Sequence, residues 1–144
     1  MKTYRPANAL LADIKGVLAA RQFGSHRSPL DLVIERLCQG RHYSWVGIYL
    51  AAPEHNTRQL LGSGNDAHPG TALPETRSKI LVSMRLAGRE VGVFDVESDR
   101  ESAFGAEDRV LLENVAQLLA LFLSGRGKYL ARKARENYAA GKTS

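Results

Sequence analysis

Residues 77–123 read RSKILVSMRLAGREVGVFDVESDRESAFGAEDRVLLENVAQLLALFL, and this stretch decides the fold. Apolar and polar side chains alternate over residues 79–86, and residues 91–96 form a second apolar run. The four residues between them, 87–90, have a length typical of a β-hairpin connection. The stretch therefore predicts two antiparallel strands that are followed, after a polar break, by a long helix.

The predicted helix, residues 106–124, carries two apolar stripes whose members recur every three or four residues. The stripes lie about 100° apart around the helix axis, so one can cover a sheet while the other needs a second helix. That helix is either the first helix of the same chain or one from a second copy. The second arrangement predicts a homodimer whose interface contains Leu112, Ala116, Leu119 and Leu123.

Two helices and a strand pair are predicted before this stretch. Ser28 is a good N-cap and Pro29 suits the first position of the second helix. The predicted elements are helices at residues 7–22 and 28–40, strands at 43–51 and 57–62, and a loop at 65–77. We therefore predict an α+β fold, in which an antiparallel sheet of about four strands has the N- and C-terminal helices packed on one face.

Composition indicates one globular domain, with 44% apolar and 24% charged residues in a chain of 144. One cysteine excludes a disulfide framework, and the four histidines lack the spacing of a helical metal site. No apolar run is long enough to span a membrane, and no apolar signal-peptide stretch follows Met1. We expect a cytoplasmic location with no membrane, metal or cofactor involved.

The positive charge is confined to the C-terminal segment. Six of the 20 lysines and arginines, but only one of the 15 acidic residues, follow residue 124. We therefore divide the chain into a domain at 1–125 and a basic tail, helical or disordered, at 126–144. The tail is either a solvated extension, which we favour, or a nucleic-acid contact in which Tyr129 and Tyr138 stack on bases. Its basic residues are Arg126, Lys128, Arg132, Lys133, Arg135 and Lys142.

The order of these elements resembles the GAF domain. The strand ILVSMRL, the hairpin AGRE, the strand GVFDVES and the F-x-x-x-D start of the last helix, Phe104 to Asp108, carry the resemblance, and SWVGIYL at 44–50 looks like the first GAF strand. The resemblance implies a signalling or regulatory domain of bacterial type. A full-length GAF domain has a longer cassette, which forms the lid of a ligand pocket, where this chain has only Asn65–Arg77. We therefore expect a reduced pocket.

The enzymatic family that the chain resembles most is the free methionine-(R)-sulfoxide reductase. Its chemistry needs an attacking thiolate and a second, resolving thiol. The resemblance places Ala72 at the catalytic cysteine and Lys79 at a pocket glutamate, whereas Asp95 and Glu97 match the acidic pair of the last strand. Cys38 lies on the apolar face of a predicted helix, where a thiol is usually inert packing. We therefore expect no catalytic residues and no enzymatic activity.

The remaining expectation is a module that acts by dimerisation or by binding a partner protein, with a reduced small-molecule pocket. We expect this pocket to be a shallow groove beside the 65–77 loop rather than a deep cavity. A carboxylate pair such as Asp95 and Glu97 suits general acid–base work or a ligand contact there, but we favour caps and turn contacts at the strand end. The predicted ligand-binding residues are Trp45, Tyr49, Met84, Phe94, Asp95 and Glu97.

Overall fold

A four-stranded antiparallel sheet with the strand order β2-β1-β4-β3 forms the centre of the protein. This computed structural model describes residues 4–20, 28–52, 57–65 and 75–141. The elements, in chain order, are α1 (Ala7–Ala19), α2 (Pro29–Gly40), β1 (Trp45–Ala52), β2 (Thr57–Asn65), β3 (Ser78–Leu86), β4 (Arg89–Ser98), α3 (Ala106–Ser124) and α4 (Lys128–Gly141).

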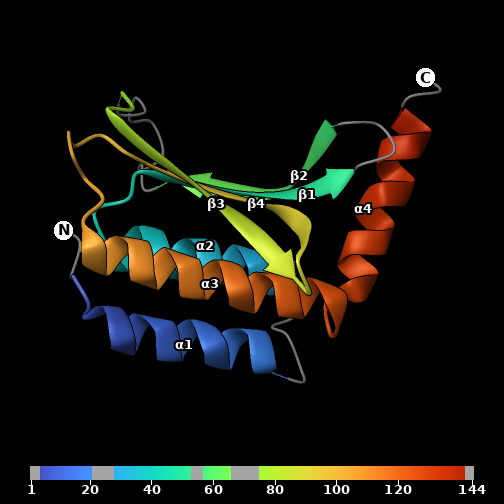
Figure 1. The fold of residues 1–144 in the computed structure, drawn as a ribbon, viewed down its shortest axis with the longest axis horizontal. Coiled ribbons are helices and arrows are strands. Elements are labelled where there is room, and N and C mark those ends of the chain that lie inside the picture. Colours follow the sequence, from blue (N-terminus) through green and yellow to red (C-terminus); the bar gives the residue numbers. More distant parts are fainter. Residues whose placement is uncertain (1–3, 21–27, 53–56, 66–74, 142–144) are drawn as a thin grey trace.

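Helices from both ends of the chain cover one face of this sheet (Figure 1). α3 packs against β3 and β4, α2 packs against β1 and β2, and α1 contacts both helices from the side away from the sheet. We call the covered face the inner face and the opposite one the outer face. Among the segments that the structure describes, no helix lies across the outer face (Figure 1). The predicted α+β architecture is confirmed.

The hairpin between β3 and β4 fixes the register of the two strands. Its turn residues Ala87 and Gly88 have φ angles of 53° and 77°, and such positive values at both positions match the right-handed twist of the strands. The connection is therefore shorter than the predicted AGRE, because the strands pair up to Leu86 and Arg89. The register shifts by one residue between Met84 and Arg85, so that Lys79 lies opposite Glu97.

The second apolar stripe of α3 is buried within the chain, which corrects the predicted dimer interface. Its members are between 0% and 3% exposed, and α3 lies between α1 and the sheet. Side chains enclosed in this way have no surface to offer to a second copy. A dimer would therefore need a different surface from Leu112, Ala116, Leu119 and Leu123.

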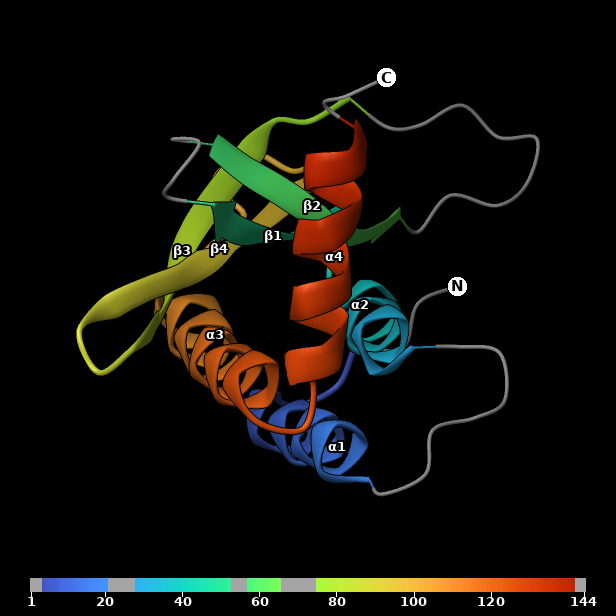
Figure 2. The ribbon, with the colours of Figure 1, turned by 90° about the vertical axis from the view of Figure 1, so that its right-hand side faces the viewer.

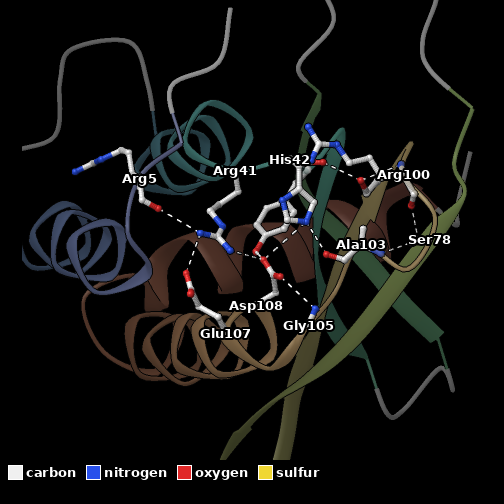
Figure 3. Close-up of polar contacts among 11 residues, drawn as sticks. Arg5, Arg41, His42, Ser78, Arg100, Ala103, Gly105, Glu107 and Asp108 are labelled. Atoms are coloured by element: carbon white, nitrogen blue, oxygen red, sulfur yellow. Dashed lines mark hydrogen bonds and ion pairs between the residues drawn. The ribbon is translucent and has the colours of Figure 1, made fainter.

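A buried ion pair joins the start of α3 to the end of α2 (Figure 3). Asp108 accepts hydrogen bonds from Arg41 at 2.8 Å, from the Tyr43 hydroxyl at 2.6 Å and from the Gly105 backbone N–H at 3.2 Å. Burial acts to raise the pKa of Asp108, but these donors outweigh it and hold the pKa below its usual value. This network is structural, because its acceptors are occupied by the chain's own donors.

The basic segment after α3 forms the helix α4, which stands at one end of the sheet (Figure 2). It contacts α3 and β2, with Ala131 buried and Tyr129 exposed. Arg132 and Lys133 both lie 5.8 Å from the centre of the Tyr129 ring, which is within cation–π range.

Candidate functional site

The outer face of the sheet carries an acidic pair beside two aromatic side chains. Asp95 and Glu97 are two residues apart on β4, so their side chains point to the same side. On β1, Trp45 pairs with Glu97 and Tyr49 pairs with Val93, which places both aromatic residues on that side as well. Four of the six predicted ligand-binding residues therefore share one surface.

The other two predicted residues, Met84 and Phe94, lie on the inner face and are corrected accordingly. Both are fully buried in the core beneath the helices. Phe94 pairs with Ile48 and with Val82, so its position is one residue out of phase with Asp95. Side chains of a strand alternate between the two faces, so neither residue can reach a ligand on the outer face.

Gly47 brings the Trp45 ring close to the acidic pair. A Cβ atom at Gly47 would lie 2.2–3.0 Å from three atoms of that ring, so only a glycine leaves room for the indole to fold over this position. Gly47 is the strand partner of Asp95. The indole therefore lies beside the carboxylate and provides an apolar wall for the site.

Three of the four carboxylate oxygens of the pair have an ion-pair or hydrogen-bond partner from the chain. The Lys79 ammonium is 3.3 Å from Asp95 Oδ2 and 3.6 Å from Glu97 Oε2, and the Thr76 hydroxyl donates to Glu97 Oε1 at 2.7 Å. The fourth, Asp95 Oδ1, is buried and has no hydrogen-bond partner among the residues described. A buried acceptor without a donor is unfavourable, because its hydration is lost and not replaced.

The environment of Asp95 disfavours its charged form. Burial raises the pKa of this carboxyl to about 6, and the negative charge of Glu97 acts in the same direction, while the Lys79 ammonium opposes both. Only 4% of Asp95 is exposed, whereas Leu81, which faces it from β3, is 59% exposed. The site thus holds one buried carboxylate on an otherwise accessible, partly apolar surface.

Cys38 lies on the other side of the sheet from this site. Its thiol is 4.0 Å from the carbonyl oxygen of Gly64 on β2, and the side of Gly64 that would bear a Cβ faces Ile34 of α2. The thiol is therefore buried between α2 and the inner face. The sheet separates the single cysteine of the chain from the acidic pair.

The predicted groove beside the 65–77 loop mostly falls on residues 66–74, which lie outside the described residues, as does Ala72. An open groove of about 410 Å³ lies elsewhere, between α1 and α3. No group of three or more metal-ligating side chains occurs within the described ranges. Nor does any helix there have the length and apolar character needed to cross a membrane.

Sequence reasoning identified Lys79 as a departure from the reductases but missed its ion pair with the acidic residues, and it missed Thr76 altogether. The contact between Lys79 and Glu97 depends on the register shift between Met84 and Arg85. An unbroken register would place Lys79 opposite Val96, on the other face. No pattern in the sequence marks that irregularity.

Solved structures of two kinds are similar to this chain. The free methionine-R-sulfoxide reductase of Neisseria meningitidis has a TM-score of 0.68 at 20% identity, over 93% of this chain and 98% of that one. The GAF domain of a phosphoenolpyruvate-protein phosphotransferase from Coxiella burnetii has a TM-score of 0.69 at 15% identity, and the match covers 85% of this chain and 96% of that one. The Staphylococcus aureus reductase in complex with its substrate has a TM-score of 0.59 at 16% identity, and the match covers 85% of this chain and 99% of that one.

No family model and no curated protein sequence matches the chain. At these identities the structural likeness concerns the fold, which signalling domains and reductases share. The strand order, the helices on the inner face and the similarity to both kinds of structure lead to one conclusion: this chain has the GAF-like fold.

Proposed function

We propose that this protein is a non-catalytic GAF-type regulatory module that binds a small molecule on the outer face of its sheet. The observation that carries the proposal is the separation of the only thiol from the acidic pair. Reduction of a sulfoxide by thiols needs a thiolate at the substrate and a second thiol to resolve the product. The chain has one cysteine, and Cys38 is buried behind the sheet.

The acidic pair supports binding. Asp95 Oδ1 is a buried acceptor for which the described part of the chain supplies no donor, and burial disfavours the charge of this carboxylate. A ligand that donates one hydrogen bond to this oxygen would remove the penalty. The Trp45 indole beside it offers an apolar surface to the rest of the ligand.

The proposed module catalyses no reaction, so its role would be regulatory. A module that only binds a ligand acts through what it contacts, so we infer that ligand binding is passed to a partner protein or to a second copy of the chain. The buried stripe of α3 does not serve as that surface.

The test uses the only tryptophan of the chain, Trp45, as a fluorescent reporter. Free methionine-R-sulfoxide, the substrate class of the similar reductases, and its N-acetyl derivative are titrated into the protein with a dithiol reductant present. We expect a saturable change for at least one probe, a loss of about tenfold in affinity in Asp95→Asn, and no methionine formed. Glu113→Gln, an exposed change on α3, is the matched control.

Two results would contradict the proposal. Formation of methionine that disappears in Cys38→Ser would show that the reductase alternative is correct. An unchanged Trp45 signal with both probes at concentrations up to about 10 mM, in the range of weak binding, would show that the outer face does not take this class of ligand.

A further inference from the structure

Lys79 occupies the acceptors that a positively charged ligand would use. Its ammonium contacts one oxygen of Asp95 and one of Glu97, at 3.3 and 3.6 Å. An ammonium group of a ligand, such as that of a free amino acid, would seek the same two oxygens. It would also meet the positive charge of Lys79 at close range, and like charges at contact distance repel.

The other described cations near this face have partners of their own. Arg58 is paired with Glu90 at 3.7 Å, and Arg77 is paired with Glu101 at 3.5 Å. Arg85 donates to the carbonyl oxygen of Gly88. Within the described residues, Lys79 is therefore the cation that is matched to the acidic pair.

The position of Lys79 suits a role in selectivity. It sits on β3 directly opposite Glu97, and its side chain is 50% exposed, so it can move away without opening the core. Exposed ion pairs contribute little to stability. The contacts with Lys79 thus leave Asp95 Oδ1, a buried oxygen with no hydrogen-bond partner among the described residues, as the acceptor for an uncharged donor.

We propose that Lys79 determines the specificity of this site, by selecting ligands with an uncharged hydrogen-bond donor over ligands with an ammonium group. The uncharged donor is an amide, a hydroxyl or a ring N–H that reaches Asp95 Oδ1 beside the Trp45 ring. This inference rests on the proposed function, because it concerns the choice of ligand at the same site.

The experiment combines one protein change with one ligand change. Wild type and Lys79→Met are titrated with free methionine-R-sulfoxide and with its N-acetyl derivative, in which an amide N–H replaces the ammonium group. Trp45 fluorescence reports binding. The titrations are run at pH 8, where the Asp95 carboxyl, with its pKa of about 6, is ionised. Lys15→Met, on an exposed position of α1, is the matched control.

We expect wild type to prefer the N-acetyl ligand. Lys79→Met should raise the affinity for the free amino acid by about two- to fivefold more than the affinity for the N-acetyl form, the range set by an exposed ion pair. Lys15→Met should change neither. Lys79→Gln, which keeps a polar group, should show the same preference as Lys79→Met.

The possible failures are distinguishable. Equal changes for both ligands in Lys79→Met would overturn this inference while leaving the proposed function intact. A wild type that prefers the free amino acid would do the same. If neither ligand binds to any of the variants, the proposed function fails, and the role of Lys79 falls with it.

Discussion

Replacing Asp95 by asparagine should make the protein more stable at neutral and alkaline pH. In the folded protein the pKa of this carboxyl is about 6, compared with the ordinary value of 3.8. The folded state therefore binds the proton more tightly than the unfolded state does. The stability that this provides is complete below about pH 4 and is lost as the pH rises through 6.

The size of the effect follows from the difference between the two pKa values. Each unit corresponds to about 1.4 kcal/mol, so a difference of about two units is worth about 3 kcal/mol above pH 7. The Asp95→Asn variant has no ionisable group at this position, so its stability does not fall in this way as the pH rises. The free energy of unfolding of the variant should exceed that of wild type by about 2–3 kcal/mol at pH 8, and the two should converge near pH 4.

Urea unfolding at a series of pH values from 4 to 8, followed by Trp45 fluorescence, measures this difference. Other carboxyl groups with shifted pKa values, such as that of Asp108, are present in both proteins and cancel. Glu113→Gln, an exposed change, should stay within about 0.5 kcal/mol of wild type at every pH. A variant that is less stable than wild type at pH 8, or a difference that does not depend on pH, would refute the reasoning about this carboxylate.

Three further changes test the fold and the site. Asp108→Ala should lower the free energy of unfolding by about 2–3 kcal/mol in urea, because it removes the carboxylate that pairs with Arg41 and accepts from the Tyr43 hydroxyl, while Arg41 keeps its ion pair with Glu107; a loss below about 1 kcal/mol would contradict this. Gly47→Ala should push the Trp45 ring off the sheet, which a shift of the emission maximum would report and an unchanged spectrum would argue against. Leu119→Glu should abolish the helical circular dichroism signal; a folded monomer obtained from a wild-type dimer would instead restore the stripe as an interface.

Local patterns in the sequence were sufficient to predict most of the elements. Ser28 accepts a hydrogen bond from the backbone N–H of Asp31, as its place before Pro29 predicted, and α3 covers the predicted residues 106–124. Period-two alternation located β3, and the apolar run at residues 91–96 located β4. These features depend on neighbours in the chain, so a single sequence contains the information.

The site was only partly predictable, because alternation does not say which face of a strand the helices cover. Met84 and Phe94 were placed with Asp95 although they belong to the inner face. The ion pair of Lys79 depends on a one-residue register shift. Whether the second apolar stripe of α3 is buried within the chain depends on where α1 packs. Both are set by tertiary contacts that no short segment of sequence specifies.

The most direct test of the proposed function is a nuclear magnetic resonance titration of ¹⁵N-labelled protein with methyl-¹³C-labelled methionine-R-sulfoxide, as the free amino acid and as its N-acetyl derivative, under reducing conditions. We predict shifts at the Trp45 indole N–H and at the amides of Asp95 and Glu97 that exceed any at Met84 and are larger with the N-acetyl ligand, while the methyl signal of each ligand remains that of the sulfoxide. A growing methionine methyl signal, or outer-face signals that neither ligand moves, would contradict the account.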